Sequence, residues 1–269
     1  MSNKAGSSKL SVKRLPKAAL AGQDANRWRI ALESAGDGMW DWHLPSNSVI
    51  YSDRWKTMLG YEPHEIGDGF QEWQTRVHPE DLPGVLEQVH SYLVRQSPTY
   101  SVEFRMRCKD GGWKWILARG MVTSRDAEGR ALHVIGTHTD ITAWRAAQQR
   151  ESGILRMIIE GRPLEEVLEA IVRGAEASQP GVVCCLQRNK KKGSCLRMVC
   201  GPSLPASFHK AVECMPVGHG GSCCAHVVLT GERVVCRSIK DDPAWSPLHE
   251  AARRAGLVSC WAEPVRDGG

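Results

Sequence analysis

The stretch that most constrains the fold is residues 100–144, which has the pattern of three consecutive strands. In its first part, from Val102 to Cys108, apolar residues alternate with charged ones, the period-two pattern of a half-buried strand. Residues 109–112 end in two glycines, which tolerate the positive φ that a tight hairpin needs. The pattern therefore predicts an antiparallel meander, with its third strand around residues 132–137.

The middle strand of this meander offers two faces with different chemistry. Trp113, Trp115 and Leu117 fall on one face, and Lys114, Ile116 and Ala118 fall on the other, because successive side chains point to opposite sides of a sheet.

The meander leads directly into a helical pattern, predicted over residues 141–159. Asp140 or Thr142 can cap this helix, because either side-chain oxygen can accept the free N–H groups of the first turn. A sheet that feeds directly into a helix suits signal transfer, since strain in the sheet can move the helix. We therefore predict that Asp140 and Thr142 are signal-transfer residues.

Several motifs in this half of the chain occur in an ordered series. They are GDGMWDWHLPSNSVIYSDRWKTMLGY at 36–61, VHPEDL at 77–82, and the Asp-Ile-Thr at 140–142. Together they resemble a PAS domain of the subclass common in bacterial sensors, over about residues 27–149. The resemblance implies an antiparallel sheet with helices packed on it. The cleft between sheet and helices can hold haem, flavin or a small metabolite.

The local patterns agree with this interpretation. We expect a short helix at 27–34 and a hairpin formed by 38–44 and 48–52. Asp53 is expected to cap the next helix, and a longer helix is predicted over 81–95, where apolar residues recur at helical spacing.

The second half of the chain has its own set of patterns. Residues 164–177 give an amphipathic helix. Strands are predicted at 182–187 and 195–200, and helices at 207–214 and from Cys223.

This half also carries motifs of a known domain. GGSC at 220–223, TGERVV at 230–235, DDPAW at 241–245 and GLVSCWAEPV at 256–265 resemble a GAF domain of the type found beside PAS domains in bacterial signalling proteins. That family normally continues with further strands, so we expect this GAF domain to be incomplete at its C-terminus.

The predicted fold class is therefore α+β, with two domains that each have an antiparallel sheet and packed helices. We expect a disordered basic tail at 1–26, a PAS domain at 27–140, a connector helix at 141–162 and a GAF domain at 163–269. The apolar positions of the connector helix favour a parallel homodimer.

Charge and hydropathy limit the partners of the chain. The net charge of +5 resides mainly in residues 1–26, and a solvated tail explains it more simply than binding to nucleic acid or anionic lipid. No run of about 18 apolar residues occurs, and the N-terminus makes a poor signal peptide. We therefore predict no membrane span and a cytoplasmic location.

The ten cysteines are interpreted mainly as buried, reduced thiols that act as small apolar residues. Cys223 and Cys224 are the redox candidates, because a thiol at a helix N-terminus is more easily ionised. Attachment of a bilin would require a histidine directly after the cysteine, but Ala225 precedes His226. Vicinal cysteines seldom ligate one ion, so we predict no metal site.

The candidate residues for an apolar ligand in the PAS cleft are Trp40, Trp42 and Trp115, although ordinary core and sheet packing explains these tryptophans more simply. A haem would need an axial histidine, for which His90 is the candidate. The Asn-Cys-Arg run of flavin photosensors is missing. The identity of any cofactor therefore stays open at this point.

No catalytic constellation is evident in the sequence. It has no glycine-rich ATP-binding pattern, no GGDEF or EAL run, no P-loop and no nucleophile elbow. We predict a sensory PAS–GAF module that is not itself an enzyme and that acts on an output domain or a downstream signalling protein. The alternative is the input half of a sensor histidine kinase or a diguanylate cyclase/phosphodiesterase, and a third interpretation is a purely structural dimerisation protein with no ligand.

Overall fold

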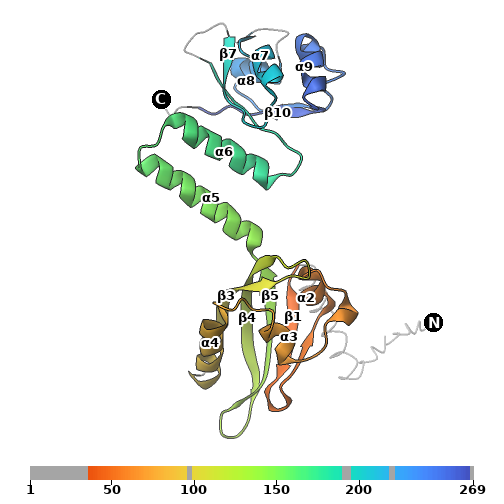
Figure 1. Cartoon of the computed structure of the whole chain (residues 1–269), viewed down its shortest axis with the longest axis vertical. Helices are drawn as coiled ribbons and strands as arrows, with labels where there is room; N and C mark the ends of the chain where they lie inside the picture. The colour runs from red at the N-terminus through yellow and green to blue at the C-terminus, as the bar shows by residue number, and fades with distance from the viewer. Residues whose placement is uncertain (1–35, 96–98, 190–194, 218–221, 267–269) are drawn as a thin grey trace, which may run out of the picture. The chain divides into compact units, whose positions relative to one another are not determined.

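The computed structural model describes residues 36–95, 99–189, 195–217 and 222–266 (Figure 1). The tail predicted at 1–26 and the helix predicted at 27–34 lie outside these ranges. The chain divides into two compact units at Arg145 and Ala146, and each unit is described by itself.

The sheet of the first unit has five strands among the described residues, all paired antiparallel in the order β2-β1-β5-β4-β3. Its strands are β1 (Gly38–His43), β2 (Ser48–Tyr51), β3 (Tyr100–Arg107), β4 (Trp113–Arg125) and β5 (Ala131–Asp140). The meander predicted from the sequence thus forms three of the five strands of this sheet, and β5 lies at its centre.

The alternation in β3 has the predicted effect. Val102, Phe104 and Met106 are buried, while the intervening residues are more exposed. The turn after β3 contains Gly111 at φ +87°, a left-handed conformation that glycine adopts without strain. This turn sets the register in which Phe104 pairs with Ile116 of β4.

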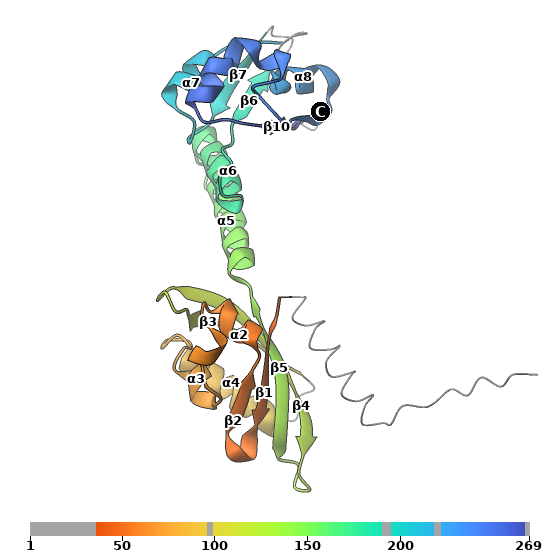
Figure 2. The ribbon, with the colours of Figure 1, turned by 90° about the vertical axis from the view of Figure 1, so that its right-hand side faces the viewer.

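Three α-helices lie on the same side of this sheet (Figure 2). They are α2 (Asp53–Met58), α3 (Phe70–Gln74) and α4 (Leu82–Arg95), and short 3-10 turns occur at η1 (Leu44–Ser46) and η2 (Pro63–Glu65). The core between sheet and helices contains Trp55, Leu59 and Phe104, which are fully buried.

The cap of α2 differs from the prediction. Ser52, not Asp53, is the N-cap, and its hydroxyl accepts the N–H of Trp55 at 3.3 Å. The same hydroxyl accepts the N–H of Met39 on β1 at 2.9 Å. Ser52 thus ties the start of α2 to the sheet, while Asp53 occupies the first turn, where a negative charge is favourable.

Helix α5 (Thr142–Ile159) begins in the first unit and continues into the second. The second unit contains a three-stranded antiparallel sheet, a two-stranded one and further helices among its described residues. Its elements are α6 (Leu164–Ser178), β6 (Leu186–Asn189), β7 (Cys195–Cys200), α7 (Ala206–Ala211), β8 (Met215–Pro216), α8 (Cys223–Thr230), β9 (Val234–Cys236), η3 (Pro243–Leu248), α9 (His249–Arg254) and β10 (Cys260–Ala262). The α+β class with antiparallel sheets is confirmed for both units.

Two sequence predictions for the second unit are wrong. The strand predicted over 182–187 forms only from Leu186 onward, because residues 182–185 have no paired strand beside them. The interpretation of the cysteines as mainly reduced thiols fails for one pair, since Cys195 of β7 and Cys214 form a disulfide. The two cysteines lie 5.4 Å apart between Cα atoms, within the usual range for a bridge.

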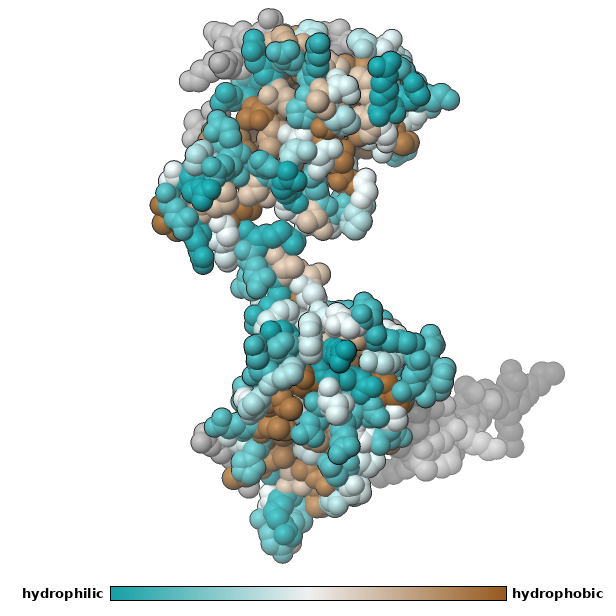
Figure 3. Space-filling view, in the orientation of Figure 1, coloured by the Kyte–Doolittle hydropathy of each residue, from teal (hydrophilic) through white to brown (hydrophobic). Residues whose placement is uncertain are grey.

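Among the described residues, no helix is long and apolar enough to cross a membrane. The visible face of each unit is mostly hydrophilic, with smaller apolar patches (Figure 3). Exposed apolar residues do occur on α5, where Leu155, Ile158 and Ile159 are each more than half exposed.

Candidate functional site

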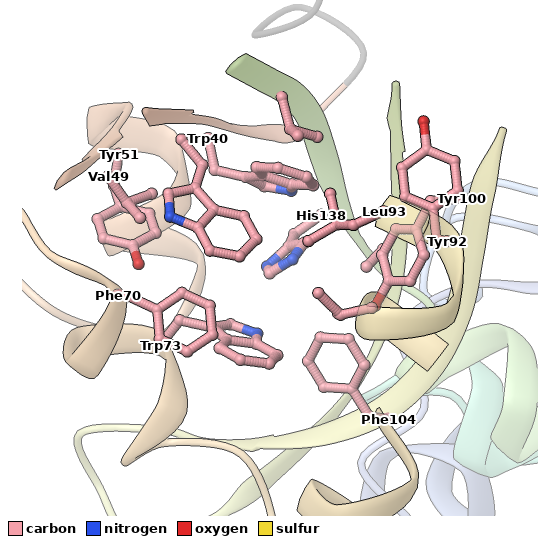
Figure 4. A pocket seen from close by; sticks show the side chains of 14 residues that line it. Trp40, Val49, Tyr51, Phe70, Trp73, Tyr92, Leu93, Tyr100, Phe104 and His138 are labelled. Carbon is pink, nitrogen blue, oxygen red and sulfur yellow. The ribbon is translucent and has the colours of Figure 1, made fainter. Parts of the chain in front are cut away.

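An aromatic cavity lies between the sheet and the helices of the first unit (Figure 4). Its volume is about 50 Å³, enough for a few water molecules. Typical sites for drug-sized ligands measure roughly 300–1,000 Å³, so haem or flavin would require the helices to move outward. The lining is almost entirely aromatic and aliphatic, and it includes Trp40, Trp42, Trp73, Phe104 and His138.

The indole of Trp40 lies across two glycines of the sheet. Trp40 on β1 pairs with Gly136 on β5, which pairs in turn with Gly120 on β4. A Cβ atom at Gly136 would lie 2.2 Å from the Trp40 ring, and one at Gly120 would lie 2.7 Å from it. The two glycines therefore make the space that the ring occupies. The Nε1 atom of Trp40 is buried and has no hydrogen-bond partner among the described residues.

His138 on β5 is the polar side chain at the centre of the cavity wall (Figure 4). Its Nδ1 accepts the indole N–H of Trp55 at 2.8 Å, which assigns the proton of the neutral ring to Nε2. Burial disfavours the charged ring and lowers the pKa of His138 to about 3. The ring is therefore neutral at pH 7 and is surrounded by Trp40 and Phe104 at centroid distances of 5.9 and 5.6 Å.

The arrangement defines what the cavity can bind. Its apolar aromatic walls suit a flat, mostly apolar molecule. The unpartnered N–H of Trp40 would favour a ligand with a hydrogen-bond acceptor, because a buried donor without a partner costs free energy.

Two of the four predicted cleft residues, Trp40 and Trp42, line this cavity. The placement of the other two in the cleft is wrong. His90 is an exposed residue of α4, so it cannot serve the cavity as an axial ligand. Trp115 lies on the opposite face of β4, because its neighbours Ile116 and Ala118 supply the buried face. The histidine that the cavity does contain, His138, was missed, although it shares the strand face of the buried Val134.

The junction between the sheet and α5 is built around the main chain of Trp115. The N–H of Ile141 donates to the Trp115 carbonyl at 2.9 Å, and the Trp115 N–H donates to the Thr142 hydroxyl at 3.0 Å. Asp140 accepts the N–H of Thr142 at 3.0 Å and pairs with Lys114 at 2.9 Å. Of the two predicted caps, Asp140 thus accepts an N–H at the start of α5, whereas the Thr142 hydroxyl accepts an N–H from strand β4.

The negative charge of Asp140 is stabilised by its hydrogen-bond partners Thr142 and Lys114. Burial acts to raise the pKa of Asp140, but hydrogen bonds from Thr142 and Lys114 outweigh it and keep the pKa below the usual value. Asp140 is therefore ionised at neutral pH.

The side chain of Trp115 holds the first turn of α5. The guanidinium of Arg145 lies 4.1 Å from the Trp115 ring centre, a distance at which cation–π attraction is effective. Arg145 also forms an ion pair with Glu103 on β3. Trp115 thus belongs to the junction rather than to the cavity.

The two predicted redox residues of the second unit have different environments. A hydrogen bond from the Cys260 thiol is the main cause that lowers the pKa of Cys223 below its usual value. Burial raises the pKa of Cys224 to about 11. Cys223 begins α8, as predicted, but it is buried rather than exposed.

Comparison with known proteins places both units in described families. Residues 48–138 match the family model of the PAS fold, and residues 161–269 match that of the GAF domain. The methyl sulfide methyltransferase-associated sensor of Methanosarcina acetivorans is 30% identical over 220 residues, which cover 78% of this chain and 21% of the relative.

Other relatives match the chain over shorter lengths. The probable diguanylate cyclase DgcE of Escherichia coli is 29% identical over 116 residues, which cover 43% of this chain and 10% of the relative. The hybrid signal transduction histidine kinase A of Dictyostelium discoideum is 29% identical over 96 residues, which cover 35% of this chain and 4% of the relative. The chain thus spans about a fifth or less of the length of these relatives.

Proposed function

We propose that this chain, a PAS domain followed by a GAF domain that together form a sensor module, reports the state of its aromatic cavity through helix α5. The observation that carries the proposal is the junction at Trp115, where one residue of the PAS sheet bonds to both Ile141 and Thr142. The signal would be a small ligand in the cavity; the described lining of the cavity contains no cysteine, so a change in thiol redox state would act through the GAF cysteines instead.

The strand β4 provides the physical link. Ala118 lines the cavity, and Trp115, three residues earlier on the same strand, holds the start of α5. A ligand that pushes the cavity wall outward would move β4 and with it the bonds to Ile141 and Thr142. Such a ligand shifts the helix only if it binds one arrangement of the junction more tightly than the other.

The test is to replace Asp140 by Ala in the full chain. The change removes the acceptor for the Thr142 N–H and the partner of Lys114. We expect amide exchange in the first turns of α5 to accelerate roughly fivefold, the equivalent of about 1 kcal/mol for a lost cap. The PAS sheet should retain its exchange protection, because Asp140 is at the edge of the core.

The matched control is Asp126→Ala, which removes an ion pair with Arg130 at the other end of β4 and β5. This variant should leave α5 unchanged. Unaltered exchange of α5 in Asp140→Ala, or equal acceleration in both variants, would contradict the proposed route.

A second candidate function is the input half of a signalling enzyme, either a sensor histidine kinase or a diguanylate cyclase/phosphodiesterase. The observation that favours it is the length of the relatives, which include proteins named as a cyclase and as a histidine kinase. Sequencing the coding DNA across and beyond codon 269 tests it. An in-frame continuation into a catalytic domain would support this role, and a stop codon with no such remnant would favour a stand-alone adaptor.

Several expectations from the sequence stay predictions. They are the domain limits, the cytoplasmic location, the lack of enzymatic activity of its own and the homodimer through the connector helix. The dimer can be tested by measuring the mass of the protein in solution at two concentrations.

A further inference from the structure

Three cysteines of the GAF domain place their sulfur atoms close together. Cys223 is the first residue of α8, Cys236 ends β9 and Cys260 begins β10. Their Sγ atoms all lie within 4.8 Å of one another, and those of Cys223 and Cys260 are 3.3 Å apart. Cys236 and Cys260 face each other as a register pair of the two strands, so the sheet itself fixes two of the three positions.

This spacing is close to what one thiophilic ion requires. Zinc–sulfur bonds measure about 2.3 Å, which for three sulfurs around one ion gives separations of about 3.8–4.0 Å. The observed range surrounds these values, so small side-chain rotations would bring all three sulfurs into position. Cys224 lies outside the group, so the site does not require two adjacent cysteines to ligate one ion.

The surroundings supply what a thiolate group needs. The indole N–H of Trp245 donates to the Cys223 sulfur at 3.4 Å, and such contacts around metal ligands orient them and tune the site. Cys223 and Cys236 are buried, whereas Cys260 is partly exposed, which gives an ion a path from solvent.

We propose that Cys223, Cys236 and Cys260 bind one thiophilic closed-shell metal ion, Zn²⁺ or Cu⁺, in the GAF domain. Thiolate ligands select these ions. Three protein ligands complete a trigonal Cu⁺ site, whereas Zn²⁺ prefers four and would keep an open position for water or another donor. This site goes beyond the role proposed for the PAS cavity, and it differs from the prediction of no metal site, which weighed C-x₂-C pairs and the vicinal cysteines, all close together in sequence.

The test uses the full chain with its Cys195–Cys214 disulfide intact and freed of metal, with Zn²⁺ as the probe in competition with a chromophoric chelator. We expect one Zn²⁺ per chain. Because changes around a metal ligand cost 10–100-fold in affinity, loss of a ligand itself in Cys223→Ser, Cys236→Ser or Cys260→Ser should weaken binding about 100-fold or more. The matched control Cys224→Ser keeps all three sulfurs and should bind as the unmodified chain does.

A second measurement does not depend on the variants folding. Thiols of the native chain are labelled with maleimide before and after Zn²⁺ or Cu⁺ is added, and the protected cysteines are located by mass spectrometry. Protection of these three cysteines together, by either ion, supports the site. Binding unchanged in all three variants, no protection of the three thiols, or a Cys223–Cys260 disulfide in place of metal binding would overturn the proposal.

Discussion

Replacing His138 by Gln should remove a large part of the acid sensitivity of the PAS domain. The pKa of His138 is about 3 in the folded state, against 6.5 for an unburied histidine. Between these two values the unfolded chain binds a proton that the folded chain does not. The stability contribution of the neutral ring is therefore complete above about pH 6.5 and is lost as the pH falls toward 3.

The magnitude follows from the difference in pKa. Each pKa unit corresponds to about 1.36 kcal/mol, so lowering the pH from 7 to 5 should cost the native chain about 2 kcal/mol through His138 alone. Glutamine can still accept the Trp55 N–H, and it does not titrate. The His138→Gln variant should therefore lose about 2 kcal/mol less than the native chain over the same interval.

The assay is urea unfolding at pH 7 and pH 5, followed by tryptophan fluorescence. Trp40, Trp55 and Trp73 are buried in the PAS core, and Trp245 is buried in the core of the second unit, so both domains contribute to the signal and their unfolding transitions are fitted separately. Other groups titrate equally in both proteins, and the difference between their pH dependences isolates His138. An identical loss of unfolding free energy in the two proteins would refute the reasoning.

Three further substitutions test the packing around the cavity and the sheet. Phe104→Ala removes a fully buried ring and should cost about 3–5 kcal/mol of unfolding free energy, measured by urea unfolding; a loss below about 1 kcal/mol would show that the core collapses into the space. Gly136→Val places a side chain where the Trp40 ring lies and should cost at least about 1–3 kcal/mol, with a shift in Trp40 fluorescence; an unchanged spectrum would contradict the contact. Asp81→Asn weakens the bonds of this carboxylate to the backbone N–H and guanidinium of Arg105 and should cost roughly 1.5–3 kcal/mol at pH 7. Since Arg105 lowers the pKa of Asp81, that cost should diminish as the pH falls through the acid range, and a cost independent of pH would argue against the ion pair.

Sequence patterns predicted the strands and long helices well because their signals are local. The alternation in β3 and the apolar spacing in α4 and α6 depend only on neighbours along the chain. The cap of α2 was misassigned because Ser52 and Asp53 are both good caps, and the contact of Ser52 with Met39 decides between them. Such a contact between distant residues leaves no trace in the local pattern.

The candidate site was predicted less well for the same physical reason. Trp115 and His90 were placed in the cleft on their residue types, but the burial of Ile116 settles which face of β4 is inside. His138 lies 83 residues from Trp55, its hydrogen-bond partner. The sulfur cluster likewise joins Cys223 and Cys260, which are 37 residues apart. Each grouping joins a helix residue, Trp55 of α2 or Cys223 of α8, to a strand residue, so it arises from the packing of helices against sheets, which the sequence specifies only through the whole fold.

The length of α5 determines how far its C-terminal end moves when its first turn tilts. With 18 residues and a rise of 1.5 Å each, this helix is about 27 Å long. A tilt of about 5° at Thr142 would therefore displace Ile159 sideways by about 2 Å, if the helix stays straight. Because the start of the helix is held by Trp115 and by the ion pairs of Lys114 and Glu103 with Asp140 and Arg145, such a tilt would require all of these contacts with the sheet to shift together.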